Sequence, residues 1–172
     1  MKQSRLSRFV TFFLLVFLSI SVSCSNGEKD MIFDISEGME SNDRRFIFTK
    51  PPNADWLKPE NQDRITENVW IVRANEGLLF NIKIDASSNG TGPSGTRWAL
   101  GTLQDYTTEQ LQSLEFASLK KSADSKMREV VGKNFIVHLT EEDLYIDLTF
   151  LAWGNKSEGA GFSYSRSIIS IP

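Results

Sequence analysis

Hydrophobic and polar residues alternate in short runs along most of the chain after residue 68. Phe80, Ile82 and Ile84 alternate with polar neighbours, and the same period of two recurs from residue 144 to residue 153. This period places successive side chains on opposite faces of a β-strand. Turn residues separate the runs. The predicted strands cover residues 69–72, 79–85, 98–103, 114–119, 135–139, 144–153, 162–166 and 168–171.

Two other segments have the start signals of short helices. They cover residues 107–114 and 122–130, with Thr107 and Ser122 as N-caps. The chain has no internal repeat and no long helical segment between its strand patterns. About eight short strands at this spacing predict an all-β fold, an antiparallel β-sandwich or jelly roll with one or two short helices. We expect residues 44–172 to form this single domain.

The segment from residue 153 to residue 166 contains glycines, a Lys-Ser pair and an arginine. A phosphate-binding P-loop requires the Lys-Ser pair directly after its second glycine and a helix behind it, and neither condition is met. The segment instead lies between two strand patterns, which predicts a hairpin. Gly154, Gly159 and Gly161 are predicted to supply its positive φ angles.

The N-terminus has the pattern of a secretion signal, predicted to span residues 1–23. Three basic residues precede an apolar run of 12 residues, and small residues lead up to Cys24. A helix of that length rises about 18 Å, which is short of the roughly 30 Å of a bilayer core. A permanent membrane span is therefore not expected.

This arrangement resembles a bacterial lipoprotein signal, which implies that Cys24 is the lipid attachment site and the first residue of the mature protein. Cys24 is the only cysteine, so it has no partner for an internal disulfide. The signal departs from the family pattern at Ser21, where leucine is preferred. Secretion by an ordinary signal peptidase, with a free thiol at Cys24, is the alternative.

The polar and acidic segment that follows the cysteine is expected to be a flexible tether, so that residues 24–43 comprise the lipidated N-terminus and this linker. A lipid at Cys24 would hold the protein on a membrane. The expected location is the bacterial cell envelope, at the outer membrane or the cell surface.

The charge of the chain argues against nucleic acid as a partner. The formal net charge is −3, and removal of residues 1–23 would leave 16 basic and 22 acidic residues, a net charge of −6. Basic residues occur together only in short pairs, at 44–45 and 120–121. A chain of this charge lacks the basic surface that nucleic-acid binding requires.

Glu142 and Asp143 lie in the densest acidic segment, just after the only histidine, His138. A solvated turn is the first interpretation, a weak calcium site the second, and a catalytic carboxylate pair for glycoside hydrolysis the third. No cofactor other than this calcium is expected. His138 lies in a strand pattern without a nucleophile motif and is expected to be a partly exposed strand residue.

Four tryptophans are many for a chain of this size. Indole faces can stack on sugar rings, so Trp56, Trp98 and Trp153 are weak candidates for binding a glycan. Aromatic residues in strands are more often part of the core, and that interpretation stays open.

Four segments, at residues 62–73, 93–101, 138–147 and 150–166, contain distinctive motifs. These motifs resemble a recurrent all-β domain of secreted and cell-surface bacterial proteins, which occurs beside adhesion-type repeats. The similarity extends over about residues 47–168, and the sequence departs from the family pattern at Glu142, Ala152 and Ala160, where Asp, Ser and Gly are usual. It implies a surface-displayed β-module and points to no activity. The motifs are QDRITENVWIVR at residues 62–73, PSGTRWALG at 93–101, HLTEEDLYID at 138–147, and FLAWGNKSEGAGFSYSR at 150–166.

Taken together, these patterns predict a non-catalytic, surface-exposed lipoprotein module for extracellular interaction or adhesion. Its partners are expected to be the membrane, through the lipid, and a glycan or an envelope protein. The alternative is a secreted glycan-active hydrolase that uses the region of Glu142 and Asp143.

Overall fold

A computed structural model describes residues 45–169. The predicted signal sequence, Cys24 and the tether lie outside the described residues. Within the described part, no helix combines the length and the apolar character that crossing a membrane requires.

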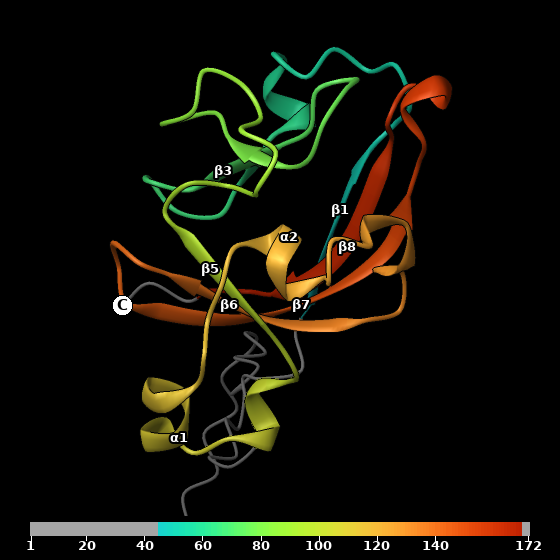
Figure 1. Ribbon diagram of the computed structural model, residues 1–172. Helices are drawn as coiled ribbons and strands as arrows, with labels where there is room; N and C mark the ends of the chain where they lie inside the picture. Colours follow the sequence, from blue (N-terminus) through green and yellow to red (C-terminus); the bar gives the residue numbers. More distant parts are fainter. Residues whose placement is uncertain (1–44, 170–172) are drawn as a thin grey trace, which may run out of the picture. The chain divides into compact units, whose positions relative to one another are not determined.

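The larger of two antiparallel sheets has five strands in the order β1-β8-β7-β6-β5 (Figure 1). Strands β5 to β8 follow one another as neighbours, and β1 from the start of the domain pairs with β8, the last strand. The register between β1 and β8 places Phe48 opposite Tyr164. The strands are β1 (Arg45–Lys50), β5 (Thr96–Leu100), β6 (Asn134–Leu139), β7 (Leu144–Trp153) and β8 (Phe162–Ser167).

The smaller sheet has three short strands in the order β2-β3-β4. They are β2 (Asp63–Arg64), β3 (Trp70–Val72) and β4 (Phe80–Asn81). In Figure 1 this sheet lies above one end of the larger sheet.

One hydrophobic core joins the two sheets. Ile71 of the small sheet belongs to the same buried cluster as Leu148 and Phe150 of β7. Trp98 lies within this cluster and makes an edge-to-face contact with Phe135, with ring centroids 5.9 Å apart. The inward residues of β7 recur every second position, as the sequence pattern predicts. The predicted all-β, sandwich-like fold is confirmed.

The helices agree with the prediction in one of two places. Helix α1 (Thr108–Ser113) has Thr107 as its N-cap, with the side chain accepting a hydrogen bond from the backbone N–H of Gln110. Helix α2 (Leu119–Ser122) ends where the second helix was predicted to begin, and its N-cap is Ser118. The prediction of a helix over residues 122–130 is wrong because Asp124 and Ser125 have positive φ angles, which end the helical path. The remaining short turns are 3₁₀ helices: η1 (Pro59–Asn61), η2 (Leu103–Asp105), η3 (Met127–Glu129) and η4 (Lys156–Glu158).

Of the strand predicted over residues 79–85, only the two residues of β4 are in a strand. The backbone turns after Asn81, whose carbonyl oxygen accepts hydrogen bonds from the N–H groups of Ile84 and Asp85 at 3.0 and 2.7 Å. The Asp85 carboxylate in turn accepts from the N–H of Asn81 at 2.9 Å. These local hydrogen bonds compete with the sheet ladder. Residues 114–119 likewise form no strand beyond a single bridge between Ala117 and Trp98.

The predicted hairpin is confirmed: β7 and β8 pair on either side of the glycine-containing segment. Among its three glycines only Gly159 has a positive φ angle, at +85°, and η4 occupies the loop. Gly161 is needed for space instead, because a Cβ atom there would lie 2.8 Å from the backbone nitrogen of Pro52. Gly154 similarly leaves room for the carbonyl of Gly161.

Candidate functional site

A solvent-open groove of about 860 Å³ lies where three parts of the domain meet. Its walls are the loop between β3 and β4, the segment from α2 to η3, and the hairpin between β7 and β8. A volume of this size falls within the usual range of small-ligand sites. We refer to it as the basic groove because its charged lining residues are five cations and one acid: Arg73, Lys120, Lys126, Arg128, Lys156 and Glu129.

Arg73 is the buried cation of the basic groove, with 3% of its surface exposed. Its guanidinium donates to the carbonyl oxygens of Gly77 at 3.2 Å, Gly154 at 3.0 Å and Gly161 at 3.3 Å. Arg73 therefore links the loop after β3 to both ends of the hairpin. Burial lowers the pKa of Arg73 to about 10, so the guanidinium keeps its charge at neutral pH.

Trp153 lies beside Arg73 at the end of β7. The guanidinium carbon is 3.8 Å from the centroid of the indole, a cation–π contact that covers one face of the ring. The indole also meets Phe150 edge to face, with centroids 5.6 Å apart. Trp153 lines the groove, but the face under Arg73 is not free to stack on a sugar.

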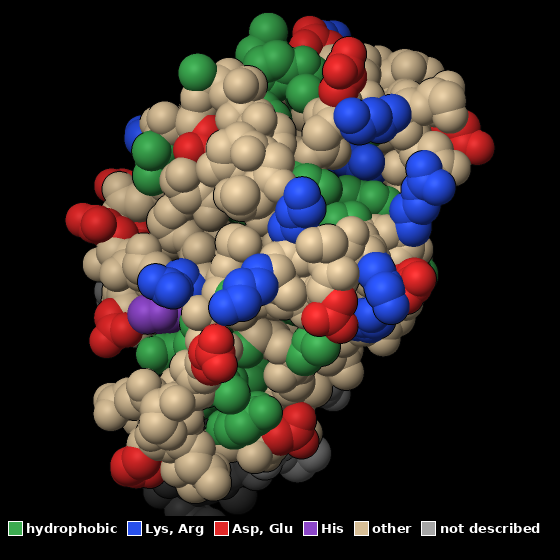
Figure 2. Space-filling view, viewed as in Figure 1, with side chains coloured by type: hydrophobic (Ala, Val, Ile, Leu, Met, Phe, Trp, Pro, Cys, Tyr) green, Lys and Arg blue, Asp and Glu red, His purple; other side chains and the backbone are tan. Residues whose placement is uncertain are grey.

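The four other cations of the basic groove are exposed to solvent. Lys120 lies on α2, Lys126 and Arg128 lie at η3, and Lys156 lies on η4. None of these four side chains forms an ion pair or a hydrogen bond with another residue between 45 and 169. The ion pairs of the described residues involve other cations, namely Arg166 with Asp63 and Lys121 with Glu115. Lys and Arg side chains gather on the face shown in Figure 2, several of them around a hydrophobic patch.

The backbone fixes the positions of these cations. Asp124 and Ser125, both with positive φ, reverse the chain between α2 and η3. The N–H of Ser125 donates to the carbonyl of Lys120 at 2.8 Å, and the N–H of Lys126 donates to the carbonyl of Ala123 at the same distance. Lys120 and Lys126 are thereby held on one compact turn despite their like charges.

The other two tryptophan candidates lie away from the basic groove. Trp98 has no exposed surface, and its indole N–H donates to the Thr96 hydroxyl at 2.8 Å, so it offers no face to a ligand. Trp56 is half-buried and packs edge to face on Phe80, with centroids 5.6 Å apart.

The acidic turn also lies outside the groove lining. The Asp143 carboxylate is 2.8 Å from Nε2 of His138, and one oxygen of Glu142 accepts from the Asn68 amide at 3.2 Å. The two carboxylates thus have separate partners. No group of three or more potential metal-ligating side chains of the His, Cys, Asp or Glu type is found among residues 45–169. His138 is partly exposed in β6, as predicted, and stacks on Tyr145 at 4.4 Å.

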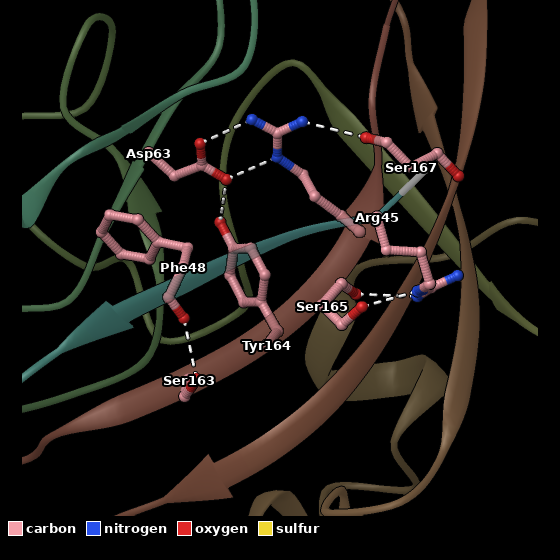
Figure 3. A network of polar contacts seen from close by, with 8 residues as sticks. Arg45, Phe48, Asp63, Ser163, Tyr164, Ser165 and Ser167 are labelled. Carbon is pink, nitrogen blue, oxygen red and sulfur yellow. Dashed lines mark hydrogen bonds and ion pairs between the residues drawn. The ribbon is translucent and has the colours of Figure 1, made fainter. Parts of the chain in front are cut away.

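A buried polar network, absent from the sequence prediction, ties β8 to the small sheet (Figure 3). The Arg166 guanidinium donates to both oxygens of Asp63 at 2.7 and 2.8 Å, and the Tyr164 hydroxyl donates to the same carboxylate at 2.7 Å. Burial alone would lower the pKa of Arg166, but the hydrogen bonds and charge of Asp63 raise it. Every member of the network has a partner, so we assign it a structural role.

Sequence reasoning did not find the basic groove. Its cations lie on segments that are more than 80 residues apart, from Arg73 to Lys156, and the overall charge is negative. The sequence offers two local signals, the basic pair at residues 120–121 and the Lys-Ser pair in the hairpin, and neither shows that these segments meet.

Comparisons with known proteins add no further assignment. The sequence matches no protein-family model, and searches of curated proteins and of solved structures give no match. A proposal for the function therefore rests on the geometry of the domain and on the sequence of the N-terminal segment of the chain.

Proposed function

We propose that this protein is a non-catalytic module of the bacterial cell envelope, anchored by a lipid on Cys24, that binds an extracellular ligand in the basic groove. The observation that carries the proposal is the concentration of five cations in one groove of a chain whose net charge is −3. Cations held close together repel one another, which costs stability, and the lining has one carboxylate, that of Glu129, against five cations. An anionic ligand would relieve that repulsion.

The anchor rests on the sequence before the domain. The short apolar run, the small residues and the single cysteine at position 24 favour lipidation. A diacylated N-terminus gives firm membrane attachment, since each buried CH₂ contributes about 0.8 kcal/mol. The resemblance to surface-displayed bacterial domains supports the same location.

A binding role agrees with the composition of the groove better than the hydrolase alternative does. Glycoside hydrolysis ordinarily uses two carboxyl groups that flank the scissile bond. The lining of the basic groove includes one carboxylate, that of Glu129, and includes neither Glu142 nor Asp143.

Mass spectrometry of the mature protein tests the anchor. When the mature protein is isolated from bacteria that express the full chain, its first residue should be an acylated Cys24. The Cys24→Ala variant should move from the membrane fraction to the soluble fraction. An unmodified Cys24, or cleavage at another residue, would refute lipidation.

Binding of the mature protein to isolated cell envelopes and to a glycan array tests the groove. The variant Lys120→Glu, Lys126→Glu, Arg128→Glu reverses three exposed charges of the groove. The variant Lys58→Glu, Lys83→Glu, Arg97→Glu is the control with the same change in net charge, at residues that do not line the groove. We expect the groove variant to lose binding and the control to retain it. Equal binding by both variants would contradict the proposed site.

A further inference from the structure

We infer that the ligand of the basic groove is an acidic polysaccharide, a chain of sugars that carries carboxylate or sulfate groups. This inference rests on the proposed function and specifies the class of ligand. It follows from three properties of the groove: the state of its cations, the polar groups between them, and its apolar content.

The exposed cations of the groove are available for a ligand. Lys120, Lys126, Arg128 and Lys156 have no ionic or hydrogen-bonding partner among the described residues, and each is exposed. Arg73 is committed to backbone carbonyls and adds positive charge at the floor. A site with several separate cations suits a ligand with several separate anionic groups, and a single small anion would leave most of them unpaired.

The polar groups between the cations suit the hydroxyl groups of a sugar. Asn155, Ser157 and Ser125 line the groove. Amide and hydroxyl side chains both donate and accept hydrogen bonds, as sugar hydroxyls do. The side-chain amide of Asn155 donates to the exposed carboxylate of Glu158 at 3.3 Å, so it is held at the rim of the groove by a weak contact.

The apolar content of the groove argues against a protein partner. Its apolar side chains are Leu78, Met127 and Trp153, and one face of Trp153 is covered by Arg73. Protein interfaces usually have a buried apolar centre from which charged residues are depleted. Here five of the lining side chains are cations, three of them lysines, and only three are apolar. Because lysine is depleted in protein interfaces, this composition favours a hydrated, charged ligand.

The test measures the affinity of the mature protein for four polymers at about 0.1 M salt, where the Debye length is about 10 Å. The probes are polygalacturonate (carboxylate), heparin (sulfate), dextran (neutral) and poly-L-glutamate (an acidic peptide). We expect binding to one or both acidic polysaccharides and none to dextran. At about 1 M salt, where the Debye length falls to about 3 Å, this binding should be lost.

Two test variants and one control variant separate charge from sugar recognition. The Lys120→Glu, Lys126→Glu, Arg128→Glu variant should bind the acidic polysaccharide at least about tenfold more weakly, since three charge contacts become repulsive. The Lys58→Glu, Lys83→Glu, Arg97→Glu control should stay within about twofold of the wild type, because none of its three residues lines the groove. The Asn155→Ala, Ser157→Ala variant should weaken polysaccharide binding severalfold and leave poly-L-glutamate binding unchanged. Unaltered circular dichroism of each variant checks that the fold is intact.

The outcomes distinguish this inference from the proposed function. In one outcome, poly-L-glutamate binds as tightly as the polysaccharides and the Asn155→Ala, Ser157→Ala variant has no effect. That result would refute the inference of a polysaccharide ligand, and the basic groove would then be a site for acidic protein segments. Absence of binding to every polymer, together with groove-dependent binding to envelopes, would also overturn it and leave the proposed function standing. A groove variant that behaves as the wild type in every assay would overturn both.

Discussion

At the scale of single residues, Lys50 stands out because only 1% of its surface is exposed. Its ammonium group donates one hydrogen bond, to the carbonyl of Pro51 at 3.3 Å. Burial lowers the pKa of Lys50, and the positive charge of Arg73 lowers it further. The charged form is therefore disfavoured in the folded state.

We predict that Lys50→Met raises the free energy of unfolding at pH 7 by up to about 1 kcal/mol, because methionine fills similar space without a charge. The folded-state pKa of Lys50 is below the ordinary value of 10.5, so the cost of the charge is present below that pKa and fades as the pH rises toward 10.5. The advantage of methionine should fade in the same range. Urea unfolding between pH 7 and pH 10 measures this, and a loss of stability at pH 7 would contradict it.

Tyr164 is the second residue whose shifted pKa makes the stability of the protein depend on pH. Burial raises the pKa of Tyr164 well above its ordinary value of 10.0, and the charge of Asp63 adds to the shift. In the unfolded chain the phenol ionises near 10.0, whereas in the folded protein it stays protonated. The stabilising contribution of Tyr164 is thus complete below pH 10 and is lost as the pH rises further.

Tyr164→Phe should cost about 1.5–3 kcal/mol at pH 7, the usual value of a hydrogen bond to a charged group. Above pH 10 the stability of the wild type should fall relative to the variant, by about 1.4 kcal/mol per pH unit. The difference in unfolding free energy between wild type and variant, measured by urea unfolding at each pH, isolates the ionisation of the Tyr164 phenol from that of all other groups. A difference that is constant from pH 8 to pH 11 would show that the phenol ionises equally in both states.

At the scale of elements, the hairpin between β7 and β8 is held against the end of β1. The N–H of Asn53 donates to the carbonyl of Gly159 at 2.9 Å, and Gly161 packs directly on Pro52. Arg73 holds the same hairpin from the other side through Gly154 and Gly161. The hairpin held by these contacts contributes residues 153–157 to the lining of the basic groove.

We predict that Gly161→Ala lowers the free energy of unfolding by about 1–3 kcal/mol, because its Cβ atom would overlap the Pro52 ring and backbone. Gly132→Ala is the comparison, since Gly132 has a φ angle of +80° but no atom within 4 Å of an added Cβ. It should lose only about 1 kcal/mol, from backbone strain. Equal and small losses for the two variants, measured by thermal unfolding, would show that the contact with Pro52 is not tight.

The elements also show what the sequence could predict. Strand β6 follows from a continuous apolar run, and β7 follows from a period-two pattern with one buried face. Helix α1 follows from its capping residue, and the hairpin follows from the glycine-containing segment between two strand patterns. The predicted strand after Leu79 failed because Asn81 and Asp85 capture backbone groups of their own turn. Strand β1 was missed because its pairing with β8 depends on residues about 120 positions away, which local patterns do not reveal.

At the scale of the whole described domain, the predicted all-β, sandwich-like fold is confirmed, and the groove that the structure reveals includes one of the predicted site residues, Trp153. Trp98 and Trp153 were singled out for their type, but Trp98 is in the core and Arg73 covers one face of Trp153. The groove exists only after the chain has brought Arg73, Lys126 and Lys156 together. A negative net charge conceals such a local concentration, because it averages over surfaces that face different ways.

The central claim is that an acidic polysaccharide binds in the basic groove. NMR titration of the ¹⁵N-labelled mature protein with polygalacturonate oligomers tests it most directly, because it locates the ligand. We expect the largest shifts at the amides of Gly77, Ser125, Lys126, Asn155 and Lys156, and small shifts at Trp70 and Asn81 on the small sheet. Shifts centred on the small sheet or on the acidic turn at Asp143, or no shifts at all, would contradict the account.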